Sequence, residues 1–154
     1  MVTKMQVENA QRAWGEGIVS IAAAHNTGMD YVERARTHIK SLYAYDISPV
    51  LFKPTLAADI QFRPTFEGAL SYFVAGNDEY SEDKGFAIKG WTKVRFENEG
   101  IIINGKSAIA MGNYFFMTPE GDEVKVEFSF GYIVDSGGSL RINLHHSSIP
   151  ASLE

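Results

Sequence analysis

The second half of the chain consists of four apolar runs separated by short turns that contain glycine. The runs are residues 86–96, 101–117, 123–134 and 140–147. The third run alternates most regularly, with Val124, Val126, Phe128, Phe130 and Tyr132 on one face and Lys125, Glu127 and Ser129 on the other. Period-two alternation predicts strands with one buried face, and the short turns predict an antiparallel meander. Such a sheet is stable only if other elements cover its apolar face.

The first third of the chain supplies that cover, because its apolar residues recur with helical spacing. Residues 7–25 are predicted to form an amphipathic helix, and a second helix runs to about Tyr43. An aspartate three residues after Thr27 predicts that the second helix starts at Thr27. Residues 48–55 are predicted to contain an edge strand closed by proline, and residues 64–77 a short third helix.

Helices followed by an antiparallel meander predict the α+β class, with the helices on one face of the sheet. The order of the elements matches a cone-shaped fold, in which a strongly curved antiparallel sheet wraps around the N-terminal helices and leaves a pocket. We expect a single domain over residues 1–154. The long second run needs a bulge in order to bend, and Gly105 and Gly112 are the expected sites.

Composition excludes several classes of function. The net charge of -5 argues against a nucleic-acid partner, which would require a basic face. The chain has no cysteine, so disulfides, thiolate nucleophiles and cysteine metal sites are excluded. No apolar run approaches the ~20 residues of a membrane span, and the first residues lack the apolar block of a signal peptide. These features predict a cytoplasmic protein with no membrane partner.

The segment RINLHHSSIP, residues 141–150, places two histidines and two serines at the end of the last strand. Neighbouring residues of a strand point to opposite faces, so one histidine and one serine face the helices. If the apolar residues earlier in this strand face the core, His146 and Ser148 follow them inward. In the opposite register His145 and Ser147 take that place.

The histidines do not form a familiar metal-binding pattern. There is no His-x-His pair and no His-Glu-x-x-His helix. A zinc site built from His25, His38 and one of the terminal histidines stays open as an alternative, because the first two lie on different predicted helices.

Several segments resemble the iota-class carbonic anhydrases: LFKPT, FRPTFEGALSYFVAGN, FAIKGW, AIAMGNYFF, FSFGYIV and LHHSSIP. The resemblance covers roughly residues 8–150. This class is similar to the association domain of calcium/calmodulin-dependent protein kinase II and has the nuclear transport factor 2-like architecture. The resemblance implies reversible hydration of carbon dioxide to bicarbonate without a metal or other cofactor, with manganese or zinc as the alternative. It also implies a homodimer or a higher homo-oligomer.

The resemblance places Thr27, Tyr45 and Ser148 around the substrate or bicarbonate, with Tyr43 as the alternate for Tyr45. We expect their hydroxyls to donate hydrogen bonds to the oxygen on which negative charge grows. His146 lies beside Ser148 in the favoured register. Histidine in general, with an unperturbed pKa of about 6.5, suits the acceptor of the proton from water.

Two other functions compete with the enzyme. A fold alone does not establish catalysis, so a non-catalytic oligomerisation or small-ligand-binding module of the same fold is the main alternative. An isomerase or cyclase of this architecture would need an acidic base in the cone. Glu127 falls on the face opposite the aromatic residues, which disfavours that alternative.

Overall fold

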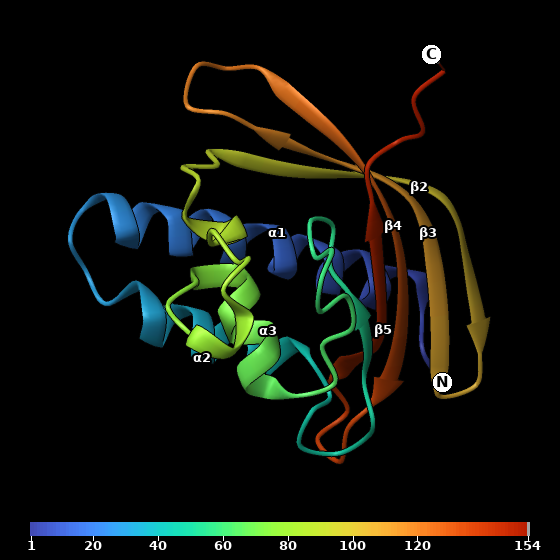
Figure 1. Cartoon of the computed structure of the whole chain (residues 1–154). Coiled ribbons are helices and arrows are strands. Elements are labelled where there is room, and N and C mark those ends of the chain that lie inside the picture. Colours follow the sequence, from blue (N-terminus) through green and yellow to red (C-terminus); the bar gives the residue numbers. More distant parts are fainter. Residues whose placement is uncertain (154) are drawn as a thin grey trace.

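The computed structural model describes residues 1–153, which form helices packed on one face of a curved sheet (Figure 1). The elements in chain order are α1 (Lys4–Asn26), α2 (Tyr31–Leu42), β1 (Leu51–Lys53), α3 (Phe66–Val74), the short 3-10 helices η1 (Asp78–Tyr80) and η2 (Phe86–Ile88), β2 (Lys93–Asn104), β3 (Ser107–Met117), β4 (Glu123–Val134) and β5 (Leu140–Ser148). The predicted α+β class is confirmed. The predicted single domain extends to Glu154, which lies outside the described residues.

The sheet has the strand order β1-β5-β4-β3-β2. The four long strands form the predicted antiparallel meander. β1 adds to its edge by pairing in parallel with β5, and the prediction of an edge strand here is confirmed. The sheet curves around α1, while α2 and α3 cover the part of the concave face nearer β1 and β5 (Figure 1).

Local capping explains where the helices begin. The side chain of Thr3 accepts from the backbone N–H of Gln6 and starts α1. The side chain of Thr65 caps α3 in the same way. None of the helices in residues 1–153 is both long and apolar enough to cross a membrane.

Thr27 does not start α2, so that prediction is wrong. The structure extends α1 to Asn26 and makes Thr27 its C-terminal cap, with the hydroxyl donating to the carbonyl oxygen of Ala23 at 2.9 Å. The cap of α2 is Asp30, whose carboxylate accepts from the backbone N–H of Glu33 at 3.0 Å. A carboxylate at a helix N-terminus also interacts favourably with the helix dipole, which favours the aspartate over the threonine.

One predicted bend lies at Gly112. The register of β2 and β3 shifts between Asn98 and Gly100, and Gly112 lies opposite this bulge. A Cβ at Gly112 would overlap the carbonyl oxygen of Glu97, so the close approach of the two strands requires glycine. Gly105 serves a different purpose, because it lies in the β2–β3 turn with a φ of 61°.

A second bulge decides which terminal residues face the helices. Gly131 of β4 pairs with Leu144, but the next residue of β4 pairs with Ile142, so Asn143 is an extra residue in β5. The extra residue reverses the alternation, and Ile142 and His145 therefore face the same side. The favoured register, which had assumed that Ile142 and Leu144 share a face, is wrong.

Candidate active site

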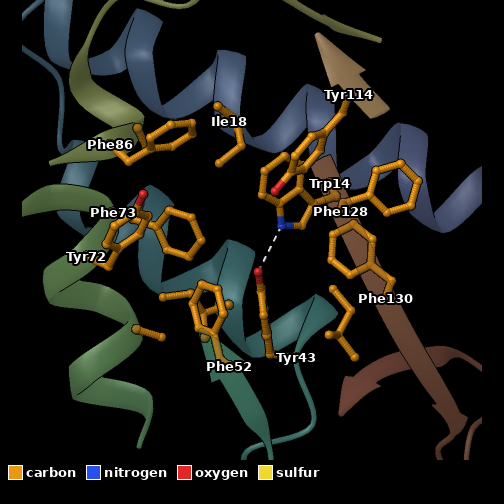
Figure 2. Close-up of a cluster of buried hydrophobic side chains, with 14 of the residues drawn as sticks. Trp14, Ile18, Tyr43, Phe52, Tyr72, Phe73, Phe86, Tyr114, Phe128 and Phe130 are labelled. Atoms are coloured by element: carbon orange, nitrogen blue, oxygen red, sulfur yellow. Dashed lines mark hydrogen bonds between the residues drawn. The ribbon is translucent and has the colours of Figure 1, made fainter. Parts of the chain in front are cut away.

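The core is centred on Trp14 of α1, which is 1% exposed. Seven aromatic rings have centroids within 6.5 Å of it: His38, Phe73, Phe96, Tyr114, Phe116, Phe130 and His145. Figure 2 shows Tyr43 below the indole, with the Trp14 Nε1–H donating to its hydroxyl. This hydrogen bond, 3.0 Å long, begins a chain of polar groups inside an otherwise apolar core.

The chain of hydrogen bonds continues from Tyr43 to the rim of the core. The Tyr43 hydroxyl lies 2.8 Å from Nδ1 of His145, and Nε2 of His145 lies 3.1 Å from the Tyr114 hydroxyl. The Tyr114 hydroxyl in turn bonds to Oγ of Ser147. Oγ of Ser147 lies 2.5 Å from Oγ1 of Thr55, where the chain ends.

One direction of donation gives every hydrogen bond of this series a donor. An indole N–H only donates, so Tyr43 accepts from Trp14, and we assign its own proton to the hydrogen bond with His145. His145 is then the tautomer that accepts at Nδ1 and donates from Nε2 to Tyr114. Continued in the same sense, Tyr114 donates to Ser147 and Ser147 donates to Thr55. The Thr55 hydroxyl also hydrogen-bonds with the side chain of Tyr72, which brings that phenol into the same group of hydroxyls.

Burial keeps the titratable members of this hydrogen-bond chain neutral. Desolvation lowers the pKa of His145 well below its ordinary value, because the imidazolium is disfavoured away from water. Desolvation also raises the pKa of Tyr43 and of Tyr114 above their ordinary values. The chain is therefore an array of neutral donors suited to stabilising negative charge, and a poor acceptor of a full proton.

Two further side chains lie next to Thr55, the last member of the hydrogen-bond chain. The Tyr72 hydroxyl accepts from the backbone N–H of Leu56 at 3.2 Å, and burial raises its pKa to about 12. The ammonium of Lys53 donates to the carbonyl oxygens of Ser147 and Thr55 at 3.2 and 3.4 Å. Thr55 is half-buried, so this end of the chain is where a small molecule can reach it.

A cavity of about 620 Å³ opens beside this cluster. It is bounded by β1, by residues 61–64 and by β5, and Lys53, His145 and His146 are among the residues that line it. The hydroxyl residues Thr55, Ser147, Tyr72 and Tyr114 lie behind this lining and are not part of it. Most of its wall is apolar, with Phe52 and Leu144 contributing from the two strands. An apolar cavity with a few convergent polar groups is the usual form of a small-molecule site.

The loop that carries Thr55 is held by a buried ionic cluster. Arg63 is fully buried, and its guanidinium makes two hydrogen bonds to Asp83 at 2.8 and 2.9 Å. Glu82 accepts from three successive backbone N–H groups, of Ala58, Asp59 and Ile60, at 2.7 to 3.2 Å. These contacts hold residues 54–63 against the helical layer, and they place Thr55 beside β5.

The structure does not gather the predicted set of residues. Thr27 is exposed and lies thirteen residues after Trp14 along α1, about 20 Å away at 1.5 Å per residue. Tyr45 donates to the carbonyl oxygen of Arg63 at 2.7 Å and is not part of the hydrogen-bond chain. Its alternate Tyr43 is part of it.

The terminal pair is also reversed. His145 and Ser147 are buried at 2% and 1% exposure, whereas His146 is exposed on the outer face. Ser148 is on that outer face too, where its hydroxyl donates to Glu127 at 2.9 Å. The inward placement predicted for His146 and Ser148 is therefore wrong, and the alternative register is the observed one.

Three residues of the cluster were not identified from the sequence: Thr55, Tyr72 and Tyr114. Each lies in a segment that carries the resemblance, namely LFKPT, SYF and NYFF. The patterns of these segments predict an edge strand, a helix and a strand of the meander, which are structural roles. Their hydroxyl residues were the available signal, and only the structure shows that they converge.

The histidines do not assemble into a metal site. Among residues 1–153, no group of three or more histidine, aspartate or glutamate residues could hold a metal ion. His25 is exposed and packs on the ring of Tyr31 at 4.8 Å. His38 lies in the core, where its Nε2 has no hydrogen-bond partner. The alternative of a three-histidine zinc site is therefore wrong.

The comparison with protein families gives one match. The model of the metal-independent carbonic anhydrase family matches residues 5–149. The chain belongs to this family. A metal-independent carbonic anhydrase from Nostoc sp. (strain PCC 7120) is 40% identical over 152 residues, which are 97% of this chain and 74% of that protein.

Solved structures agree with this family membership. The crystal structure of an iota-carbonic anhydrase from a cyanobacterium complexed with bicarbonate has a TM-score of 0.95 and 39% identity, covering 98% of this chain and 94% of that one. A putative calcium/calmodulin-dependent protein kinase II association domain from Xanthomonas campestris has a TM-score of 0.56 and 22% identity, covering 87% and 83%. The second likeness supports the predicted cone-shaped, nuclear transport factor 2-like fold alone. The predicted resemblance to the iota class is confirmed.

Proposed function

We propose that this protein catalyses the reversible hydration of carbon dioxide to bicarbonate without a metal ion. The observation that carries the proposal is the chain of neutral donors from Trp14 to Thr55, in a protein of the metal-independent carbonic anhydrase family. A relative 39% identical to this chain has been solved in complex with bicarbonate. A series of neutral donors suits that anion, because each member polarises the next and the hydroxyls at its end stabilise negative charge on oxygen.

The catalytic contribution is stabilisation of the charge that develops during attack by water. As the new C–O bond forms, the electron pair of one C=O bond moves to its oxygen. The hydroxyls of Thr55, Ser147 and Tyr72 meet at the end of the hydrogen-bond chain, and their role in this proposal is to donate to that oxygen or orient the water once the substrate displaces their mutual contacts. A preorganised donor of this kind contributes about 2.7 to 4 kcal/mol to lowering a barrier. The apolar wall of the cavity accepts carbon dioxide, which has no charge.

The proton of the attacking water leaves without a buried base. His145 already accepts a hydrogen bond at Nδ1, and burial disfavours its charged form. His146, the expected proton acceptor, lines the 620 Å³ cavity from the outer face of β5, on the side away from the buried hydroxyls. We therefore assign the proton to solvent and buffer reaching the cavity, and we expect the rate to depend on buffer concentration.

A stopped-flow measurement with a pH indicator tests the function. The purified protein is treated with a chelator and shown to be metal-free by elemental analysis. We expect it to hydrate carbon dioxide well above the buffer rate, and added zinc or manganese not to raise the rate. Absence of any rate above buffer, with or without these metals, would support the non-catalytic binding or oligomerisation module.

The outer face of the sheet supports a further proposal about assembly. It exposes large apolar side chains at Leu51, Ile102, Ile109 and Met111. Exposed apolar surface of this kind is typical of an interaction site, so we propose that two copies associate through this face. Light scattering coupled to size exclusion would show a dimer, and Met111→Glu would shift it toward the monomer. A monomer at all concentrations would refute the proposal. The cytoplasmic location stays a prediction of the sequence.

A further inference from the structure

Lys53 brings a positive charge to the end of the hydrogen-bond chain. It is the last residue of β1, and its Nζ donates to the carbonyl oxygens of Ser147 and Thr55. The hydroxyls of the same two residues lie 2.5 Å apart. The ammonium therefore ties together the two backbone segments that present the terminal hydroxyls.

The charge of Lys53 is not neutralised by the protein. Within residues 1–153 it forms no ion pair with a carboxylate, and burial alone lowers its pKa. An ammonium has three N–H donors, and two of them are used by the carbonyl groups. Among residues 1–153 the remaining N–H has no partner, and it belongs to a half-buried side chain that lines the 620 Å³ cavity.

Arg63 lines the same cavity, but its guanidinium is already paired with carboxylates of the protein. Its guanidinium pairs with Asp83 at 2.8 Å and lies 3.7 Å from Glu82. It also donates to the backbone oxygens of Ile60 and Gly68. Arg63 thus holds the loop, and its charge is compensated by two carboxylates.

We propose that Lys53 binds bicarbonate through its free N–H group, inside the cavity that it lines and next to the carbonyl groups of Thr55 and Ser147 that it contacts. The proposal rests on the reaction proposed above and assigns the anion a residue that distinguishes it from carbon dioxide. Bicarbonate carries a full negative charge and carbon dioxide carries none, so an ammonium acts on the first far more strongly. The chain as a whole has a net charge of -5 and repels anions, which makes an uncompensated cation at the site significant.

A purely mechanical role for Lys53 predicts different behaviour. If the ammonium only clamped two carbonyl groups, its loss would loosen the site for any occupant and would not depend on salt. If it binds the anion, its loss weakens bicarbonate specifically, and dissolved salt screens the interaction in the wild type. Lys53→Arg separates the two roles, because it keeps the charge but changes the geometry of the clamp.

The test is a titration with bicarbonate, followed by 1H–15N NMR of the amide groups of Thr55 and Ser147 at constant pH. It compares the wild type with Lys53→Met, Lys53→Arg and Lys106→Met, the last removing an exposed charge from the β2–β3 turn. We expect Lys53→Met to raise the Kd for bicarbonate about tenfold, the effect of losing one charge-assisted hydrogen bond at a half-exposed site. Lys53→Arg should stay within about threefold of the wild type, and Lys106→Met should not differ from it.

The outcomes separate this proposal from the proposed reaction. Equal Kd values for the wild type and Lys53→Met, or the same weakening in Lys53→Arg, would overturn anion binding by Lys53. Raised salt should weaken binding to the wild type more than to Lys53→Met, and an equal response would also overturn it. Carbon dioxide hydration is measured on the same samples. A wild type that binds bicarbonate through Lys53 but does not hydrate carbon dioxide would refute the reaction and leave the anion site standing.

Discussion

Ser147→Ala, compared with Ser148→Ala, isolates the inward hydroxyl of the terminal pair. The two serines are neighbours in β5 and undergo the same chemical change. Ser147 is 1% exposed and links Tyr114 to Thr55, whereas Ser148 bonds to Glu127 on the outer face. Any difference between the two variants therefore reports on the face to which each residue points.

The magnitude follows from the contacts that are lost. Ser147→Ala breaks the path from Tyr114 to Thr55 and removes a donor next to the reacting oxygen, which should lower kcat/KM about 100-fold to 1000-fold. Because Tyr114 keeps its contact with His145, the loss of stability is limited to about 1 to 3 kcal/mol, the cost of an unsatisfied buried hydroxyl. Ser148→Ala should change kcat/KM less than twofold and stability by less than about 0.5 kcal/mol.

The assay is stopped-flow hydration of carbon dioxide, with urea unfolding of the same preparations to show that each variant is folded. Circular dichroism should be unchanged in both. If Ser148→Ala lost activity and the folded Ser147→Ala kept it, the register given by the bulge at Asn143 would be refuted for the active protein. If neither variant lost activity, the terminal hydroxyls would have no part in the reaction.

Three other substitutions test the surroundings of the site. Burial lowers the pKa of His38 from 6.5 to about 4. Between these two pH values the unfolded protein binds a proton at this residue and the folded protein does not. The free energy of unfolding therefore falls by up to about 3 kcal/mol as the pH drops from 6.5 to 4. His38→Leu should make urea unfolding less dependent on pH in this window, and an unchanged slope would contradict the assignment. Tyr43→Phe leaves the Trp14 N–H and Nδ1 of His145 unpaired, so it should cost about 2 kcal/mol or more, and a neutral result would argue against the buried chain. Glu82→Gln should speed hydrogen exchange of the three backbone N–H groups that its carboxylate holds, with a loss of about 1 kcal/mol or less at this partly exposed site. Unchanged exchange would show that the loop does not depend on that carboxylate.

Much of the fold can be predicted from local sequence patterns. Helical spacing in the first third and alternation in the second half place the helices and the meander, because each pattern depends only on residues a few positions apart. The third helix, α3, lies inside its predicted range of residues 64–77, and Thr65 caps it. Thr27 failed as a cap because Asp30 competes for the same short turn, and the sequence rule does not rank two adjacent candidates.

The register of β5 depends on a contact that no local pattern contains. Alternation is reliable along an uninterrupted strand, and RINLHHSS shows no sign of the extra residue at Asn143. The bulge arises where β5 crosses the curved β4 at Gly131, a position in which a side chain would meet Leu144 and Asn143. The curvature of the whole sheet therefore decides that His145 rather than His146 faces the helices.

The family and the α+β architecture could be recognised from the sequence, since they rest on segments and periods that are visible in it. The site could not, because its members come from α1, the end of α2, the loop after β1, β3 and β5, and meet only when the sheet closes over Trp14. Hydroxyl residues are common and look alike in isolation. What distinguishes Thr55 and Ser147 from Thr27 and Ser148 is burial and hydrogen bonding, which are properties of the packed core.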